Sequence, residues 1–259
     1  MNIKVDPDWW KKIFDEVYLL TDARSVCDEE LTRQEVDLIL EMLPIRPQHK
    51  ILDLCGGHGR HSLELYAQGF TGCTLLDYSK YLIDHARSNA EIKNYRIKLI
   101  KRDARDTGLP SESFDHVLIL GNSLGYTVET GADELILQEA KRVLRKKGWI
   151  LVDVTDGSTV EETLMPTAWH EIDADKVVCR QRELVGERVN ARELVLSKNE
   201  GLIRESTYSI RIYKSGELAM LMEKAGFKKV RVQSDFRPHQ DKGDYGFMNR
   251  RMLAIGHKL

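Results

Sequence analysis

The chain has 259 residues, of which 42% are hydrophobic and 31% are charged, so it has enough apolar side chains for a core and does not have the composition of a disordered protein. Its 39 Lys and Arg residues are balanced by 41 Asp and Glu residues, and the net charge of -2 argues against a broad basic surface for nucleic acids. No run of about 18 apolar residues predicts a membrane helix, the first residues carry no apolar secretion signal, and the four cysteines form no CxxC pair, so we expect a cytoplasmic protein with reduced thiols.

Residues 1–46 are predicted to form an N-terminal helical segment that acts as a lid. Apolar residues recur there every three or four positions, first in residues 10–20 and again in residues 31–43. Thr32 is followed three positions later by Glu35, a spacing typical of a capping box. We therefore expect Thr32 to cap the second helix of this segment.

From residue 47 to residue 160, short apolar runs alternate with amphipathic stretches, and residues 213–259 add a helix and two more apolar runs. Such alternation, with strands that are apolar almost throughout, is typical of a parallel sheet covered by helices on both faces. The two stretches together predict an α/β fold with a doubly wound (Rossmann-like), mostly parallel sheet of seven strands. The expected strands are 51–54, 71–76, 97–100, 117–120, 149–154, 230–232 and 252–255, and the expected helices are 60–68, 79–90, 133–143 and one that Ser215 caps and that ends at Gly226.

Residues 161–212 are predicted to be an antiparallel β insertion after the fifth strand. Residues 188–196 alternate between polar and apolar side chains with the period of two that a strand imposes, and turn-forming residues separate three or four such runs. We expect this insertion to be a lid over the substrate, an interface between identical subunits, or both.

A glycine-rich turn at residues 55–59 lies directly between an apolar strand and a helix. In an open parallel sheet, ligands bind outside the carboxyl end of the first strand, and glycines let a ligand approach the backbone closely. A dinucleotide site would have a third glycine where this chain has Ser62, and Asp53 at the strand end would repel a pyrophosphate. The loop therefore favours a cofactor with a positively charged ammonium group, and a dinucleotide stays open as the alternative.

Two further carboxylates follow the next two predicted strands. Asp77 ends the second strand, where a carboxylate can accept hydrogen bonds from ribose hydroxyls, and Asp103 ends the third, where one can accept a hydrogen bond from the exocyclic amine of a base. Either acid taken alone could be a helix cap or a solvated strand end. Taken together with Asp53, they are predicted to surround one nucleoside.

The run DLCGGHG at positions 53–59, with Asp77 and Asp103 at these spacings, resembles the class I S-adenosylmethionine-dependent methyltransferases. The resemblance spans about residues 50–156, and positions 54–62 are similar to a bacterial branch of the family that methylates small molecules. It implies S-adenosyl-L-methionine as the cofactor. It also implies catalysis mainly by positioning, because the sulfonium of the cofactor supplies the electrophile.

The resemblance also assigns roles by position. Asp53 and Gly57 would flank the methionine end of the cofactor, Asp77 the ribose, and Asp103 with Ala104 the adenine. No metal site is expected, because the histidines beside the glycine loop have no third ligand nearby in the sequence. The residues expected to bind the cofactor are Asp53, Leu54, Cys55, Gly56, Gly57, Gly59, Asp77, Tyr78, Asp103, Ala104, Arg105, Gly121 and Asn122.

The acceptor side of the site is predicted from fewer signals. Residues 120–126, after the fourth strand, occupy the place where this family binds acceptors, and the chain lacks the Asn-Pro-Pro-Tyr and Pro-Cys motifs of enzymes that methylate nucleic-acid bases. Each candidate here also has a structural interpretation as a core or surface residue. The catalytic candidates are His170, His239 and Tyr18, and the candidates for binding the acceptor are Tyr18, Tyr126, His170, Tyr208 and Arg211.

These patterns predict transfer of a methyl group to a nitrogen or oxygen atom, and less readily a carbon atom, of a small metabolite. Three alternatives stay open: a methyltransferase that acts on protein or tRNA, an NAD-dependent oxidoreductase that uses the same glycine loop, and a non-catalytic subunit that binds the cofactor. The expected partner is a small-molecule acceptor, with self-association through the β insertion and without membrane or nucleic acid.

Overall fold

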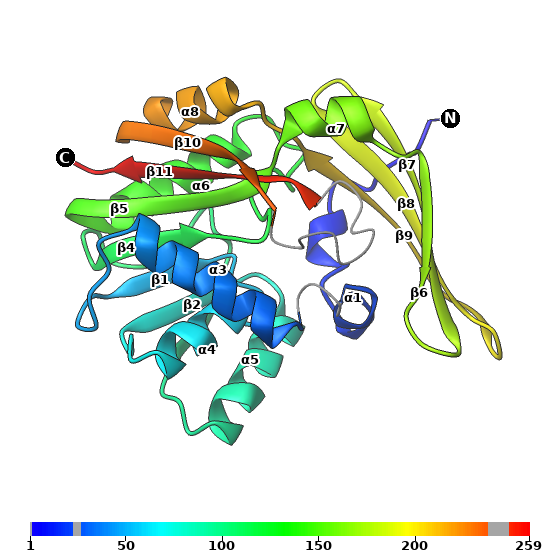
Figure 1. Ribbon diagram of the computed structural model, residues 1–259, viewed down its shortest axis with the longest axis horizontal. Helices are drawn as coiled ribbons and strands as arrows, with labels where there is room; N and C mark the ends of the chain where they lie inside the picture. The colour runs from blue at the N-terminus through cyan, green and yellow to red at the C-terminus, as the bar shows by residue number, and fades with distance from the viewer. Residues whose placement is uncertain (1, 23–26, 238–248) are drawn as a thin grey trace.

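A seven-stranded sheet with the order β10-β11-β5-β4-β1-β2-β3 forms the centre of the fold (Figure 1). The computed structural model describes residues 2–22, 27–237 and 249–259 of the chain. Strands β1 to β5 pair in parallel, whereas β11 is antiparallel to both β5 and β10. This confirms the predicted doubly wound, mostly parallel sheet. The strands are β1 (Ile51–Leu54), β2 (Cys73–Asp77), β3 (Lys98–Lys101), β4 (Phe114–Ile119), β5 (Leu144–Thr155), β10 (Lys228–Phe236) and β11 (Arg251–His257).

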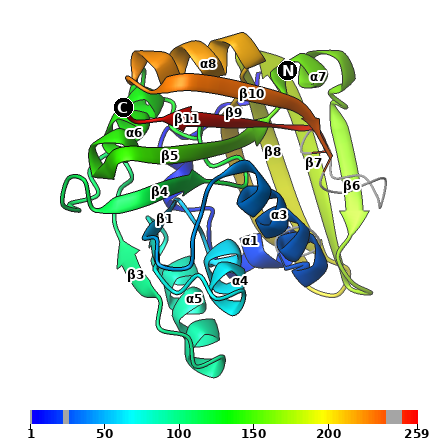
Figure 2. The same ribbon diagram turned by 60° about the vertical axis from the view of Figure 1, so that its left-hand side comes forward.

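Helices cover both faces of this sheet (Figure 2). Along β1, Ile51 belongs to the core under one layer of helices and Leu52 to the core under the other, as the alternation of side chains in a strand requires. Helices α3, α4 and α5 pack on the first face, and α6 and α8 pack on the second. Their bounds are α3 (Glu29–Met42), α4 (Arg60–Ala67), α5 (Lys80–Ile92), α6 (Ala132–Val143) and α8 (Ser215–Lys224).

Two predicted helix caps are wrong. Helix α3 is capped by Asp28, whose carboxylate accepts a hydrogen bond from the Leu31 N–H at 2.9 Å, and Thr32 lies inside the helix. A carboxylate binds the free N–H groups of a helix start more strongly than a hydroxyl does. Helix α8 begins at Ser215, and the residue before it, Lys214, occupies the cap position. None of the described helices has the length and apolar character that crossing the membrane would require.

The N-terminal segment is less helical than predicted. It consists of the short 3-10 helix η1 (Trp9–Lys11) and helix α1 (Glu16–Thr21), followed by α3. Many of its apolar residues, Trp9 among them, pack on the β insertion and on the loop after β4 instead of on a helical partner. Because of this packing, the regularly spaced apolar residues in 10–20 do not form one continuous helix.

The insertion after β5 is a four-stranded antiparallel sheet with the order β6-β7-β8-β9. Its strands are β6 (Thr167–Glu171), β7 (Lys176–Val185), β8 (Arg188–Ser197) and β9 (Gly201–Arg211), and the unpredicted helix α7 (Gly157–Thr163) precedes them. The sheet stands beside the carboxyl ends of the central strands, with η1 and α1 between the two sheets (Figure 1). An ion pair of 2.7 Å between Arg204 and Asp15 ties the insertion to the N-terminal segment.

A buried ion cluster joins the N-terminal segment to the core. The Glu35 carboxylate of α3 contacts Arg60 and His61 of α4 and accepts a hydrogen bond from Arg251 of β11 at 2.6 Å. Arg251 also pairs with Asp153 of β5 at 2.7 Å. Burial by itself would raise the pKa of Glu35, but the two arginines outweigh it and hold that pKa well below its ordinary value. Glu35 is therefore ionised at neutral pH.

Replacing Arg251 with Met should lower the free energy of unfolding by about 3 to 5 kcal/mol, because it leaves the buried Asp153 without its cation and Glu35 with one arginine fewer. Urea denaturation followed by circular dichroism measures this. The control is Arg192→Met, which removes an ion pair with Glu205 from a side chain that is 45% exposed and should cost less than about 1 kcal/mol. Equal losses in the two variants would contradict the importance of the cluster.

Candidate active site

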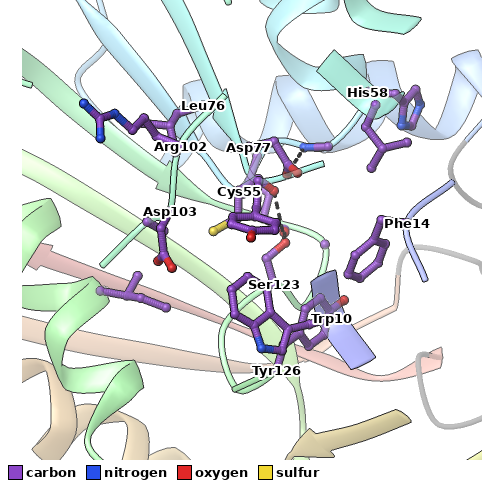
Figure 3. Close-up of a pocket in the computed structure, with 18 of the residues that line it drawn as sticks. Trp10, Phe14, Cys55, His58, Leu76, Asp77, Arg102, Asp103, Ser123 and Tyr126 are labelled. Carbon is purple, nitrogen blue, oxygen red and sulfur yellow. Dashed lines mark hydrogen bonds between the residues drawn. The ribbon is translucent and has the colours of Figure 1, made fainter. Parts of the chain in front are cut away.

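A cavity of about 990 Å³, including the space at its mouth, lies beyond the carboxyl ends of β1, β2, β3 and β4 (Figure 3). Its walls come from the glycine loop, from the residues that follow β2, β3 and β4, and from the N-terminal segment. This position is that of a small-molecule site in an open α/β sheet.

The glycine loop forms the wall of the cavity that follows β1. Cys55, Gly57 and Gly59 have φ angles of 61°, 58° and 79°, in the left-handed region that glycine adopts most easily. A Cβ atom on Gly56 would lie 2.2 Å from a methyl group of Leu75 and 2.5 Å from the carboxyl carbon of Asp53. A side chain at position 56 would therefore displace the loop.

Asp77 holds the loop to the end of β2. Its carboxylate accepts a hydrogen bond from the Gly57 N–H at 2.9 Å (Figure 3). It accepts another from the Ser79 N–H at 2.8 Å. Burial raises the pKa of Asp77, although these backbone hydrogen bonds oppose the shift. Each carboxylate oxygen keeps a further lone pair, so Asp77 can accept hydrogen bonds from two adjacent hydroxyl groups of a ligand.

Asp103 lies at another end of the cavity, two residues after β3, and is paired with Arg105 at 2.7 Å. Burial acts to raise the pKa of Asp103, but the hydrogen bonds from Arg105 outweigh it, so the pKa is lowered. The Arg105 guanidinium is in turn 5.4 Å from the ring centre of Trp10, which lines the cavity and packs edge-on against Tyr78 at 4.8 Å. The N-terminal segment thus closes this end of the cavity.

Asp53 is fully buried beneath the loop and does not line the cavity. It accepts a hydrogen bond from the Ser62 hydroxyl at 2.8 Å, and burial raises its pKa to about 6. Five of the residues expected to bind the cofactor lie outside the cavity lining: Asp53, Leu54, Gly59, Arg105 and Asn122. The other eight line it: Cys55, Gly56, Gly57, Asp77, Tyr78, Asp103, Ala104 and Gly121.

The loop after β4 is fixed by β5. The Gly121 N–H donates to Asp153 at 3.0 Å, and the Asn122 side-chain oxygen accepts from the Thr155 N–H at 2.8 Å. Ser123 donates to the Cys55 carbonyl at 3.2 Å, which ties this loop to the glycine loop. Asn122 therefore holds the backbone of the loop in place and does not face the cavity.

Two tyrosines and Phe14 form an aromatic wall of the cavity. Phe14 stacks on Tyr126 with ring centres 5.5 Å apart and contacts Tyr18 edge-on at 5.0 Å. Neither tyrosine hydroxyl has a hydrogen-bond partner in the described part of the chain, and burial raises the pKa of both phenols. The wall therefore presents two neutral hydroxyl groups that can each donate and accept a hydrogen bond.

The remaining acceptor candidates do not line the cavity. His170 lies on β6, with its Nε2 atom 3.4 Å from the Thr21 carbonyl. Tyr208 packs against Trp9, and Arg211 forms an ion pair with Glu187 at 2.7 Å. His239 lies outside the described residues. The structure thus brings together only Tyr18 and Tyr126 from this set.

Several residues of the lining were not predicted from the sequence, among them Trp10, Phe14, Arg60 and Ser123. The two aromatic residues had been interpreted as the apolar side of a helix, a pattern that does not show which neighbour a side chain meets. Arg60 carried a usable signal, because it is the first helical residue after the glycine loop.

Comparison with known proteins gives the family. Residues 51–148 match the model of a family described as a methyltransferase domain. The chain therefore contains a methyltransferase domain. The chain is similar to the glycine/sarcosine N-methyltransferase of Aphanothece halophytica, with 23% identity over 223 residues that cover 82% of this chain and 79% of the relative.

Two solved structures show the same fold as this methyltransferase. An S-adenosylmethionine-dependent methyltransferase from Clostridium acetobutylicum superposes with a TM-score of 0.73 at 13% identity, over 93% of this chain and 97% of the other. The sugar N-methyltransferase KedS8 from Streptoalloteichus superposes with a TM-score of 0.68 at 19% identity, over 100% of this chain and 96% of the other. Both likenesses extend beyond the matched domain to the N-terminal segment and the β insertion.

The methyltransferase uses S-adenosyl-L-methionine as its cofactor, and the cavity suits that molecule. Gly56 and Gly57 line the cavity without a side chain that would keep a ligand away from the loop backbone. Asp77 lies beside this backbone with lone pairs that can accept hydrogen bonds from ribose hydroxyls. When it is bound, the cofactor supplies an electrophilic methyl group on its sulfonium.

Replacing Gly56 with Ala should weaken binding of S-adenosylhomocysteine, the demethylated cofactor, by at least about tenfold, because the new methyl group overlaps Leu75 and Asp53 and displaces the loop. Isothermal titration calorimetry measures the affinity. The control is Gly216→Ala in α8, where a Cβ atom meets nothing within 4 Å and the affinity should not change. Unchanged affinity in Gly56→Ala would contradict the tight path of the loop.

The raised pKa of Asp53 predicts a specific pH dependence of stability. The folded protein holds this proton up to about pH 6, whereas the ordinary pKa is 3.8, so the contribution of Asp53 to stability falls as the pH rises between these values and is constant above them. Asp53→Asn removes this pH dependence, and its stability relative to wild type should rise by about 2 kcal/mol from pH 4 to pH 7. Urea denaturation at several pH values measures this.

Asp115→Asn is the control for that series. Burial acts to raise the pKa of Asp115, but hydrogen bonds from Lys50 and Arg145 outweigh it and lower the pKa. The stability of this variant relative to wild type should therefore fall as the pH rises through the acid range. If the difference in stability between Asp53→Asn and wild type did not change with pH, the pKa of Asp53 would not be raised in the folded protein.

Proposed function

We propose that this methyltransferase transfers the methyl group of S-adenosyl-L-methionine to a nitrogen atom of a small molecule. The observation that carries this proposal is the aromatic wall of Phe14, Tyr18 and Tyr126, which has two hydroxyl groups without a partner among the described residues and lines the cavity. In the same proposal, Asp77 binds the ribose hydroxyls, Asp103 and Ala104 contact the adenine, and the glycine loop lies beneath the methionine end.

The protonation states of four groups in the cavity lining favour nitrogen as the acceptor atom. Burial raises the pKa of Tyr18, Tyr126 and Cys55, so these groups keep their protons at neutral pH. Burial also lowers the pKa of His61 to about 4, and its Nε2 atom is occupied by Glu35. None of these four groups is suited to take a proton from a hydroxyl, whereas a neutral amine already has a free lone pair.

The two tyrosines can orient such an amine. A neutral phenol oxygen accepts a hydrogen bond from an N–H group, which fixes the direction of the remaining lone pair on the nitrogen. Holding the nucleophile in line with the methyl group at about 3 to 3.5 Å is the main contribution that a protein makes to such a displacement. Because the hydroxyls are not committed to other described residues, they are available for this role.

The surroundings of the cavity favour a small acceptor. The N-terminal segment covers the cavity and is tied to the β insertion by the Arg204–Asp15 ion pair and by packing of Trp9 on Tyr208. Such a cover can exclude water and limits the size of the acceptor. The similarity to a glycine/sarcosine N-methyltransferase over 82% of this chain and to a sugar N-methyltransferase over 100% of it supports the same choice. Self-association through the insertion stays a prediction.

Purified protein incubated with cofactor labelled in its methyl group and a panel of amino sugars and amino acids should place the label in the soluble, low-molecular-weight fraction. Matched compounds with a hydroxyl group in place of the amine should not react. The double variant Tyr18→Phe/Tyr126→Phe should lose about 10- to 100-fold in kcat/KM and keep its affinity for S-adenosylhomocysteine, because only the acceptor loses its hydrogen bonds.

The matched control is Tyr66→Phe/Tyr95→Phe, which alters a stacked pair of tyrosines outside the cavity lining and should leave kcat/KM unchanged. Label in precipitated protein or RNA would contradict the proposed small acceptor. A hydroxyl compound that reacts faster than its amine counterpart would contradict the choice of nitrogen.

A further inference from the structure

Arg60 is a cation of the cavity lining that the proposed function does not use. It is the first residue of α4, directly after the glycine loop, and its side chain is 12% exposed. Its Nη1 atom contacts the Glu35 carboxylate and donates to the Thr32 hydroxyl at 3.0 Å. Two residues of α3 therefore fix this guanidinium group at the edge of the cavity.

The donors of Arg60 are only partly used. A guanidinium group has five N–H groups, and both of those on Nη1 are accounted for by Glu35 and Thr32. The N–H groups on Nε and Nη2 have no partner among the described residues, and neither atom is sealed from solvent. Arg60 can therefore present an adjacent pair of donors to a ligand while its other side stays bound to α3.

The charged groups are distributed unevenly along the cavity. Asp77 and Asp103 lie on the side of the cavity that β2 and β3 form and that Trp10 closes. Arg60 lies on the side of α1 and α3. Two titratable neighbours of Arg60 in the lining, His61 and Tyr18, are uncharged at neutral pH, because burial lowers the pKa of His61 to about 4 and raises that of Tyr18. This distribution matches a ligand with hydroxyl donors at one end and a carboxylate at the other.

We propose that Arg60 binds the carboxylate at the amino-acid end of the cofactor through its Nε and Nη2 groups. Planar guanidinium and carboxylate groups form two parallel hydrogen bonds, and the positive end of α4 adds to the attraction. Glu35 acts as a positioning residue, because it holds Arg60 in the required orientation. The proposal rests on the use of S-adenosyl-L-methionine and is independent of the acceptor.

The test compares two ligands that differ in the amino-acid end. S-Adenosylhomocysteine carries the carboxylate, and 5′-methylthioadenosine has the same nucleoside without it. In calorimetric titrations, Arg60→Met should bind S-adenosylhomocysteine about 10- to 100-fold more weakly than wild type and bind 5′-methylthioadenosine with an affinity within about twofold of wild type. Arg60→Lys, which keeps the charge but not the paired donors, should fall between wild type and Arg60→Met for the first ligand.

The matched control is Arg102→Met, because Arg102 lines the same cavity on the side of Asp103. This variant should change the affinities for the two ligands by the same factor. Unchanged affinity of Arg60→Met for S-adenosylhomocysteine would overturn the proposal, and Arg60 would then be available to bind the acceptor. Equal losses for both ligands would also overturn it, since Arg60 would then act through the shape of the loop.

The outcome is separable from that of the proposed function. A wild-type protein that binds neither ligand would overturn this proposal together with the use of the cofactor. A wild-type protein that binds S-adenosylhomocysteine but methylates no amine would contradict only the proposed acceptor, and the comparison of the two ligands would still decide the role of Arg60.

Discussion

The hydrogen bond from the Gly57 N–H to Asp77 joins the ends of two neighbouring parallel strands. It fixes a loop that has almost no side chains against a carboxylate that still has lone pairs to offer. The parallel pairing of β1 with β2 and β4 brings the other walls of the cavity to the same edge of the sheet. The cofactor site therefore depends on this edge of the sheet, where the hydrogen bond to the buried Asp77 carboxylate fixes the conformation of the glycine loop.

The ion cluster around Glu35 extends the site into the rest of the molecule. One carboxylate of the N-terminal segment holds Arg60 at the cavity and Arg251 in the last strand, and Arg251 reaches Asp153, which holds the loop after β4. Segments from the beginning, middle and end of the chain are thus connected through charges that are costly to leave unpaired in the interior. This connection gives the cavity walls a common, rigid support.

The parts of the fold with local signals were predicted well. Apolar strands alternating with amphipathic helices indicated the sheet and the helices on its faces, and the period-two pattern indicated the β insertion. The predicted caps of α3 and α8 were wrong because several residues near each helix start could occupy the cap position, and long-range contacts decided which of them does. Glu35 illustrates this, since its spacing from Thr32 suited a cap while its carboxylate is bound by distant arginines.

The sequence alone determined the glycine loop and the acids that end β2 and β3, because backbone freedom and strand ends are local properties that a short motif records. Only the tertiary structure decided which side chains reach the cavity. It placed Asp53 beneath the loop, left His170, Tyr208 and Arg211 outside the lining, and brought Trp10, Phe14 and Arg60 into it. Those positions depend on how the N-terminal segment packs against the insertion and the core, and contacts between segments far apart in the chain leave no fixed spacing in the sequence.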